Sequence, residues 1–451
     1  MDAKTRDDLL GLFQSKLNEA MRFYLETCTR CGVCTEACHV HASMGQVRYI
    51  AAYRHEIIRR LYKKYFKARG KVWPSVGESK ELTEMALEEL YEAAYSCTGC
   101  RRCMLYCHFG IDTQMLMSIA KLLLIGANAE PETLTMLADM SIEKGKSIDI
   151  FKEGFINGLK RLEDEVVAKW RQEAGEAVIP VDVEGADLLY VALAGAHSII
   201  PAAAIFNAAG EKWTLSFFEA VNFGAFVGDP TRTKLILDRI VNEALRLKVK
   251  EVCICECGTA FRVMKQLSGK HPFTVSAITD VHARYLKEGR IRLDKTKFNV
   301  PITYHDPCQI ARNGGVMDAP RYILQHLTDD FRELAPEPAY NWCCGGGGGL
   351  VALGEDTLDF RMKSSRVKAD QVKETHAQIL ATACENCHTQ LSNLNDHYKM
   401  GVDVQFVPTK WSGIIPALLT GNENPLTLKR SRCAAGHKAM YNAEWGGYPD
   451  K

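Results

Sequence analysis

The pattern of hydrophobic positions changes near residue 181 of the chain. Before it, apolar residues recur at helical spacing over residues 5–26 and in two further stripes, Ile50–Tyr65 and Leu82–Ala93. Residues 127–180 are polar and predict a helical connector. After residue 181, short apolar runs alternate with helical patterns, which is typical of α/β layers with mainly parallel sheets. The predicted helices there include Thr231–Leu247 and Leu358–Glu374, and the predicted strands are Asp187–Leu193, Glu251–Cys255, Phe273–Ala277, Pro301–Tyr304, Gln378–Ala383 and Asp403–Val407.

Composition adds a redox expectation to this outline. The chain has 451 residues, enough for several domains, and its net charge of +1 gives no general attraction to nucleic acid. It has 17 cysteines but no apolar signal segment at the N-terminus, so we expect a reducing cytoplasm, where clustered thiols bind metal rather than pair. The richest apolar stretch, Ala192–Ala209, is interrupted by polar residues and predicts a buried strand and helix rather than a membrane span.

One cysteine spacing occurs twice in the helical half. Each copy reads Cys-x2-Cys-x2-Cys-x3-Cys, over residues 28–38 and 97–107. This spacing is typical of a ferredoxin module with two 4Fe–4S clusters, in which the fourth cysteine of each run binds the other cluster. A pair of zinc sites is the alternative, although zinc ribbons use separate Cys-x2-Cys pairs. We expect one cluster to be held by Cys28, Cys31, Cys34 and Cys107, and the other by Cys97, Cys100, Cys103 and Cys38.

A histidine, His39 or His108, follows the fourth cysteine of each run, where proline is usual. Either histidine can tune a cluster potential by hydrogen bonding or charge. We expect instead that both are partly exposed and have no special role.

Five later cysteines form an ordered set: Cys308, then the doublet Cys343 and Cys344, then Cys384 and Cys387. Adjacent cysteines cannot easily bridge each other, and five thiols exceed one tetrahedral site, so the doublet is predicted to bind two atoms of one polynuclear cluster. The glycine run 345–349 fits, because a backbone without Cβ atoms can approach bulky sulfides and direct N–H groups at them. A hinge beside a disulfide is the alternative, whereas a phosphate loop is disfavoured because no Gly-Lys-Ser/Thr follows.

The α/β half contains an internal repeat. When its two copies are superposed, Cys308 falls near Ala194 or Gly195, and Cys387 falls on Cys257. The segment Cys343–Gly345 falls on Asn222–Gly224. The first copy has therefore lost its doublet, and we expect one polynuclear cluster in the chain.

Three cysteines of the first copy, Cys253, Cys255 and Cys257, alternate at a strand end and share one face if the strand continues. They are either an extra metal or substrate site or, as we expect, a vestige of a lost Cys-x-x-Cys. Cys433, in the basic tail, is expected to be an ordinary thiol.

Residues 48–71 carry nine Lys or Arg and one acid, Glu56. Two interpretations remain open. The run could face an anionic membrane surface or an acidic partner. Alternatively it is a solvated face paired with acids, namely Glu78, Glu81, Glu84, Glu88, Glu89 and Glu92.

The late cysteines and the helical ferredoxin spacing together resemble the "CCG" cysteine-rich domain and the α-helical ferredoxin of heterodisulfide reductases, in particular of the D-type proteins in the membrane redox complexes of sulfate-reducing anaerobes. The resemblance implies an α+β multidomain protein with an α-helical two-cluster ferredoxin domain followed by two α/β CCG-type repeats, the first degenerate. The expected domains are 1–126 (ferredoxin), 127–180 (connector), 181–296 (degenerate repeat), 297–425 (CCG domain) and 426–451 (tail).

The resemblance also implies that Cys308, Cys343, Cys344, Cys384 and Cys387 hold a non-cubane 4Fe–4S cluster where a disulfide or trisulfide is cleaved or formed. His305 and His388 are the candidate proton donors, with Asp306 and Glu385 as weaker ones.

Partners implied by the resemblance are a membrane cytochrome b-type subunit, further redox subunits, and a small thiol or sulfur-carrier protein, with the chain at the inner face of the membrane. No Gly-x-Gly-x-x-Gly follows a strand, so we expect no flavin or NAD on this chain. Two alternatives remain, a non-catalytic iron–sulfur relay of a glycolate or lactate oxidase-type flavoenzyme and a structural zinc protein.

Overall fold

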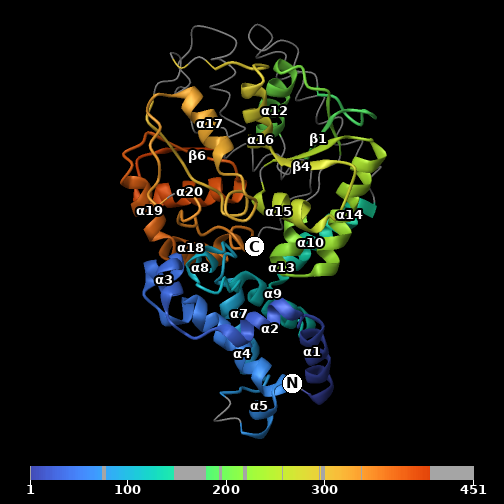
Figure 1. The fold of residues 1–451 in the computed structure, drawn as a ribbon, viewed down its shortest axis with the longest axis vertical. Helices are drawn as coiled ribbons and strands as arrows, with labels where there is room; N and C mark the ends of the chain where they lie inside the picture. Colours follow the sequence, from blue (N-terminus) through green and yellow to red (C-terminus); the bar gives the residue numbers. More distant parts are fainter. Residues whose placement is uncertain are drawn as a thin grey trace.

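The computed structural model describes residues 2–73, 78–146, 179–191, 196–216, 221–255, 257–293, 295, 300–336 and 338–406. Cys433 and most of the predicted connector's second half lie outside these residues. A helical region with the N-terminus forms one end of the molecule, and two sheet-containing lobes lie side by side at the other end (Figure 1). Within the described ranges, no helix is long and apolar enough to cross a membrane.

The first region is helical, as its apolar spacing predicts. Its elements are α1 (Ala3–Ser15), α2 (Glu19–Thr27), η1 (Val33–Ala37), α3 (His39–Met44), η2 (Val47–Tyr49), α4 (Ala51–Phe66), α5 (Ala68–Val72), α7 (Glu84–Tyr95), α8 (Arg102–Tyr106), α9 (Thr113–Gly126) and α10 (Glu132–Lys146). The helical prediction for residues 5–26 is confirmed, but two helices rather than one cover this range. The first helix ends at Ser15, and Asn18 starts a new one because its side chain accepts a hydrogen bond from the Met21 N–H, 2.9 Å away.

The buried faces of these helices differ in part from the predicted stripes. Tyr53 and Met85 are exposed, at 43% and 65%. The buried face of α4 instead passes through Arg54, Ile58 and Leu61. One buried core joins this region to its neighbour, because Leu134 of α10 and Phe226 pack into it.

The basic run 48–71 lies mainly on α4 and α5. Six of its nine basic side chains form ion pairs with nearby acids, for instance Lys63 with Glu78 at 2.9 Å and Arg48 with Glu92 at 2.7 Å. The interpretation as a face paired with acids therefore describes most of the run. Exposed pairs of this kind contribute about 0–1 kcal/mol each.

The first lobe contains a four-stranded parallel sheet in the order β2-β1-β3-β4. Its elements are β1 (Leu188–Val191), α12 (Ala196–Ala208), β2 (Trp213–Leu215), α13 (Val221–Val227), α14 (Pro230–Arg246), β3 (Glu251–Ile254), α15 (Gly258–Leu267), β4 (Thr274–Ala277) and α16 (Ile278–Lys287). The predicted strands and the helix Thr231–Leu247 are confirmed to within about two residues, although residues 192 and 193 lie outside the described ranges. Strand β2 was not predicted.

The second lobe contains a three-stranded parallel sheet in the order β5-β6-β7. Its elements are β5 (Ile302–Tyr304), α17 (Asp318–Leu327), η4 (Gly354–Thr357), α18 (Leu358–Ser364), α19 (Arg366–Lys373), β6 (Ile379–Thr382), α20 (Glu385–Tyr398) and β7 (Asp403–Phe406). The predicted helix Leu358–Glu374 is divided at Ser365, whose backbone leaves the helical conformation.

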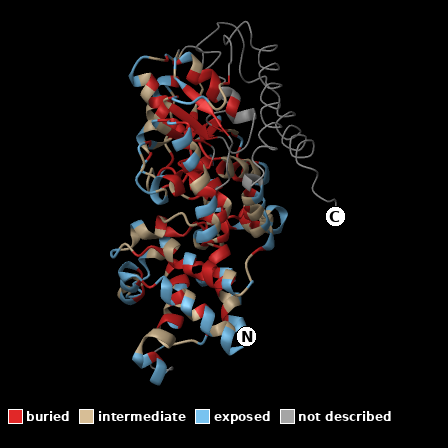
Figure 2. Cartoon of the chain, turned by 90° about the vertical axis from the view of Figure 1, so that its right-hand side faces the viewer, coloured by how far each residue is buried: buried red, intermediate tan, exposed pale blue. Residues whose placement is uncertain are grey.

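The two lobes share one buried core, and α16 of the first packs on α17 of the second. Figure 2 shows buried residues running through the strands of the sheet region. The chain is thus an α+β multidomain protein in which two related parallel sheets stand on a helical base. The strands end toward the loops that carry the late cysteines, which is where parallel sheets usually place ligands.

Candidate metal centres

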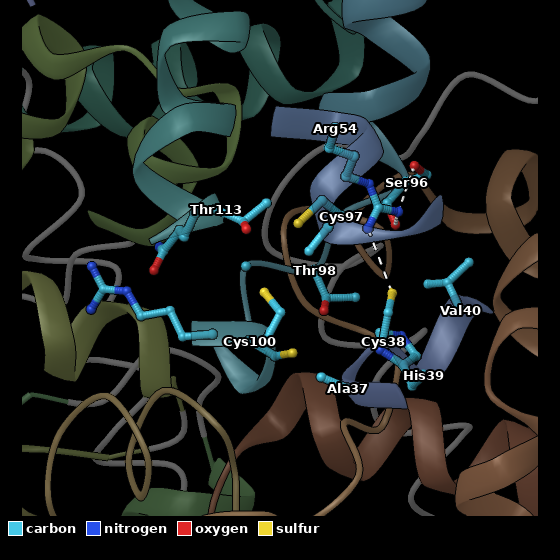
Figure 3. A pocket seen from close by; sticks show the side chains of 15 residues that line it. Ala37, Cys38, His39, Val40, Arg54, Ser96, Cys97, Thr98, Cys100 and Thr113 are labelled. Atoms are coloured by element: carbon cyan, nitrogen blue, oxygen red, sulfur yellow. Dashed lines mark hydrogen bonds between the residues drawn. The ribbon is translucent and has the colours of Figure 1, made fainter. Parts of the chain in front are cut away.

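The second ferredoxin motif surrounds a small hollow that is partly open to solvent. Cys97, Cys100 and Cys103 line it together with Cys38, the fourth cysteine of the first motif. Figure 3 shows Cys38, Cys97 and Cys100 around this space. Burial raises the pKa of Cys103 well above its usual value, and the nearby charges of Cys100, Cys97 and Cys38 raise it further. The structure therefore brings together the four cysteines that the crossed pairing predicts.

Cys28, Cys31, Cys34 and Cys107 form the other group. Burial raises the pKa of Cys34, and negative charge on Cys28, Cys107 and Cys31 raises it further, so these four side chains are neighbours. Cys31 is exposed, and the other three are partly buried. This site is therefore closer to solvent than the one at Cys38.

The five late cysteines come from three loops that meet at the carboxyl ends of β5 and β6. Cys308 follows β5, Cys384 is the N-cap of α20 directly after β6, and Cys387 lies in the first turn of α20. The doublet Cys343 and Cys344 comes from the long connection between α17 and η4. All five side chains are buried, with exposures of at most 8%.

The sulfurs of this set are packed together. The Sγ atoms of Cys344 and Cys387 are 3.3 Å apart. Hydrogen bonding from Cys343 lowers the pKa of Cys344 well below its usual value, and hydrogen bonding from Cys387 lowers the pKa of Cys384. Hydrogen bonds to Cys344 and Cys384 raise the pKa of Cys387 well above its usual value. A buried set rich in thiolates is the donor chemistry that iron prefers.

The glycine run next to the doublet makes two kinds of close approach. The N–H groups of Gly345 and Gly346 point at the sulfurs of Cys343 and Cys344, each at 3.4 Å. A Cβ atom on Gly347 or Gly348 would lie 2.8 Å or 2.6 Å from backbone oxygens of the second ferredoxin motif. The run therefore directs N–H groups at sulfur, as predicted, and also lies against the ferredoxin backbone, which the sequence did not predict.

The five-cysteine site and the second ferredoxin site touch each other. The sulfurs of Cys100 and Cys343, which come from different domains, lie within 4.8 Å of each other. The Cys343 thiol also donates to the Thr98 hydroxyl, 3.4 Å away. The Arg312 guanidinium holds this junction by donating to the carbonyl oxygens of Cys100 and Asn341, at 2.8 Å and 2.6 Å.

His39 lies at this junction, and the expectation that it is partly exposed is wrong. It is 2% exposed, because α3 starts at His39 and turns its ring inward, toward the CCG domain. One ring nitrogen of His39 and the sulfurs of Cys100 and Cys343 lie within 4.8 Å of one another. His108 is exposed, as expected.

Of the two candidate proton donors, His305 lies at the five-cysteine site, whereas no ring nitrogen of His388 is grouped with those sulfurs. His305 is 1% exposed, and one of its ring nitrogens lies within 4.8 Å of the sulfurs of Cys344 and Cys387. Neither ring nitrogen has a hydrogen-bond partner among the described residues. His388 is partly exposed, with its Nδ1 3.7 Å from the Glu385 carboxylate.

The weaker acid candidate Asp306 is occupied by a bidentate ion pair. Arg321 donates to both carboxylate oxygens of Asp306 at 2.8 Å and also pairs with Glu333. A second buried cation, Lys368, is fully buried and donates to Asn341 and Gln371, each at 2.7 Å. Burial lowers the pKa of Lys368 to about 7, and no sequence signal marks this lysine because it lies in a charged helical segment.

The first lobe faces the same site with the start of a helix. Cys257 is the N-cap of α15, and the Gly258 N–H contributes to lowering the pKa of Cys384 after the larger effect of Cys387. Cys257 and Cys384 are thus both N-caps, so the starts of the two helices align Cys257 with Cys384. The superposition of the two sequence repeats had instead aligned Cys257 with Cys387. Strand β3 ends at Ile254, so Cys253, Cys255 and Cys257 do not continue along one strand face.

The residues present fit iron–sulfur clusters. None of the sixteen cysteines in the described part of the chain, including the thirteen of the three predicted sets, forms a disulfide, so the disulfide alternative is not supported there. The ferredoxin set with Cys38 surrounds a hollow, and the set with Cys107 lies together near the surface. The late set has backbone N–H groups directed at two of its sulfurs.

Two family descriptions match the chain. Residues 24–111 match a 4Fe-4S dicluster domain, and residues 302–392 match the CCG cysteine-rich domain. An Hdr-like menaquinol oxidoreductase iron-sulfur subunit 2 of Archaeoglobus fulgidus is 26% identical over 86% of this chain and 79% of its own length. The D-type protein of the dihydromethanophenazine:CoB–CoM heterodisulfide reductase of Methanosarcina mazei is 28% identical over 85% of this chain and 92% of its own.

A more distant similarity concerns a quinone enzyme. The EtfAB:quinone oxidoreductase of Syntrophomonas wolfei is 24% identical over 82% of this chain and 55% of its own length. No solved structure matches the chain significantly.

Proposed function

Since this chain is an iron–sulfur oxidoreductase similar to the D-type protein of heterodisulfide reductases, we propose that it passes electrons between a membrane electron carrier and a disulfide or trisulfide substrate. The substrate would react at the five-cysteine site. The observation that carries the proposal is the short distance between Cys100 and Cys343, whose sulfurs lie within 4.8 Å of each other and join a ferredoxin site to that site. Electrons need no further carrier between the two.

The proposed route begins at the site of Cys28, Cys31, Cys34 and Cys107, because Cys31 is exposed and a partner's redox group can approach it. It continues through the site of Cys38, Cys97, Cys100 and Cys103 to Cys343. When bound, two cubane clusters would supply one-electron storage, and a non-cubane 4Fe–4S cluster on the five late cysteines would supply iron for a substrate sulfur.

The protein's own groups have defined tasks at the last site. The N–H groups of Gly345 and Gly346 stabilise negative charge on the doublet sulfurs. Cleaving a disulfide to two thiols consumes two electrons and two protons. We propose His305 as the nearer proton donor, because its ring lies beside Cys344 and Cys387. His388, with a partly exposed side chain, is the candidate for exchange with solvent.

The proposed partners are a membrane cytochrome b-type subunit and further redox subunits, with the chain held at the inner face of the membrane through them. The support is the similarity to relatives that are named for menaquinol and dihydromethanophenazine. The substrate would be a small thiol in its disulfide form or a small sulfur-carrier protein.

The proposal is tested by electron paramagnetic resonance of the anaerobically purified protein, oxidised with and without candidate disulfides. We expect a new signal that depends on the disulfide and is absent from Cys343→Ser. Absence of any such signal with every disulfide, in a protein that contains all its iron, would contradict the disulfide chemistry and leave the relay.

A second candidate is a relay protein with no disulfide chemistry of its own. It is favoured by the burial of all five late cysteines, none more than 8% exposed, and by the similarity to the EtfAB:quinone oxidoreductase. If the chain is such a relay, the five-cysteine site should be reduced and oxidised reversibly, and its signal should not change when disulfides are added.

A further inference from the structure

Arg54 is a buried cation at the second ferredoxin site. Its side chain comes from α4, is 2% exposed, and reaches toward Cys38 (Figure 3). Its guanidinium donates to the Tyr49 carbonyl at 2.8 Å, to the Ser96 carbonyl and hydroxyl at 3.2 Å and 3.1 Å, and to the Cys38 sulfur at 3.6 Å. Its Nε has no hydrogen-bond partner among the described residues.

This charge has no carboxylate beside it. In the described ranges no Asp or Glu forms an ion pair with Arg54, whereas its neighbours on α4, such as Arg59 and Lys63, are paired with acids. A guanidinium stays charged even when buried, and an unpaired buried charge is costly. Among the hydrogen-bond partners of the guanidinium, only the Cys38 sulfur, 3.6 Å away, can carry a negative charge. The balancing anion is therefore the sulfur site.

The first ferredoxin site has no comparable cation among the described residues. Arg30 is near Cys28, but its side chain is 45% exposed and pairs with Glu56 and Glu78, so solvent and two carboxylates offset its charge. The two ferredoxin sites thus differ in fixed positive charge.

We propose that Arg54 is the counter-charge of the site formed by Cys38, Cys97, Cys100 and Cys103, and that it raises the reduction potential of that site. A cluster gains one negative charge when it is reduced, and a fixed buried cation next to it favours that reduced state. The electron is then held on the ferredoxin site whose Cys100 sulfur lies within 4.8 Å of the Cys343 sulfur, next to the place where it is used. The inference depends on the proposed pair of cubane clusters and not on disulfide chemistry.

The test is a redox titration of the whole protein followed by electron paramagnetic resonance, with the signal of the second site identified as the one lost in Cys97→Ser. In Arg54→Met we expect the midpoint of that signal to fall so that its electron occupancy relative to the first site changes at least tenfold, which is about 59 mV for a one-electron couple. The signal lost in Cys34→Ser serves as the internal reference and should not move.

Two variants separate charge from structure. Arg54→Lys keeps the charge and should retain most of the potential. Arg59→Gln, on the same helix with an 11% exposed side chain already paired with Glu56, should leave the second midpoint unchanged. Equal shifts in Arg54→Lys and Arg54→Met, or no shift in Arg54→Met, would overturn the proposal.

Iron analysis covers the case in which Arg54→Met fails to retain the second cluster. Retention in Arg54→Lys then supports the counter-charge, and loss from both variants contradicts it. If the unmodified protein shows no pair of one-electron signals, the assignment of two cubanes fails instead, and the two failures are distinguishable.

Discussion

The first sheet, β2-β1-β3-β4, and the second, β5-β6-β7, are both fully parallel and lie in one shared core. In the first lobe β2 pairs with the outer side of β1, whereas the described part of the second lobe has no full strand at the corresponding side of β5. Phe331 forms an isolated parallel bridge with Ile302 of β5 there. The lobes differ most in the segments that the repeat aligns with each other, residues 222–224 and 343–345. In the first lobe this segment is part of α13, and in the second it is an open loop with a cysteine doublet.

That difference has a physical reason. In the first lobe, residues 222–224 lie in the first turn of α13, and that helix packs against α14. The open glycine loop leaves the N–H groups of Gly345 and Gly346 free to point at sulfur. Gly224, the counterpart of Gly345, serves packing instead, since a Cβ there would lie 2.6 Å from the Thr233 nitrogen on α14. A sheet can thus persist while its loop changes from a ligand site to a packing element.

The largest expected effect compares one cysteine from each lobe. Cys344→Ser should remove the five-cysteine cluster, so that the iron content falls from about twelve to about eight atoms per chain if three four-iron clusters are present. Cys257→Ser, at the matching edge of the first lobe and also buried, should keep all the iron. Iron and acid-labile sulfide analysis measures both. Iron loss from Cys257→Ser would show that the first lobe has kept a ligand.

The second prediction compares two glycines with positive φ. A Cβ on Gly348 (φ +70°) would lie 2.6 Å from the Cys97 carbonyl oxygen, whereas one on Gly185 (φ +78°) meets nothing within 4 Å. Backbone strain should lower the free energy of unfolding of both alanine variants by about 1–2 kcal/mol. The free energy of unfolding of Gly348→Ala should fall by about 1–3 kcal/mol more, because the neighbouring Cys97 carbonyl belongs to the backbone and cannot move aside easily. Urea unfolding measures the difference, and equal losses would mean that the loop does not lie tightly on the ferredoxin motif.

The smallest effect concerns His282 of α16, whose ring nitrogens have no hydrogen-bond partner among the described residues. Burial lowers its pKa to about 3, below the usual value of about 6.5. A depressed histidine pKa means that stability is full above about pH 6.5 and falls as the pH decreases, because only the unfolded chain takes up the proton. Between about pH 7.5 and about pH 5.5 the loss should reach about 1.4 kcal/mol.

His282→Phe should remove this part of the pH dependence. Thermal unfolding of both proteins at the two pH values gives the comparison, and the control is the difference between them above pH 7, where the histidine is neutral in both states. An unchanged pH slope in the variant would mean that the buried ring does not control it.

Sequence reasoning recovered most of the architecture, and cysteines that it grouped as ligands lie near one another in the structure. Every predicted strand is present, because buried parallel strands leave short apolar runs that end at turns. It missed β2, which is only three residues long. It did not find the break between α1 and α2, where Asn18 caps the start of α2, or the break at Ser365, which caps both α18 and α19. Cysteine spacing carried the crossed pairing, because a short loop can supply three ligands but not the fourth.

The residues missed at the sites were those whose neighbours are distant in sequence. Arg54 was not predicted as a site residue because it lies in a basic run, although its spacing from Ile58 and Leu61 places it on the buried face of α4. His39 was expected at the surface, because nothing near it in sequence predicts that the CCG domain covers α3.

The sequence by itself determined which cysteines belong together and that two parallel α/β repeats follow a helical module, because ligand spacing and apolar periodicity are local properties of the chain. Only the tertiary structure decided that Cys100 meets Cys343, that a buried arginine stands at Cys38, and that a glycine run lies on ferredoxin backbone. Such contacts arise where three segments that are distant in sequence pack against one another, and burial, charge and clearance there depend on all of them at once.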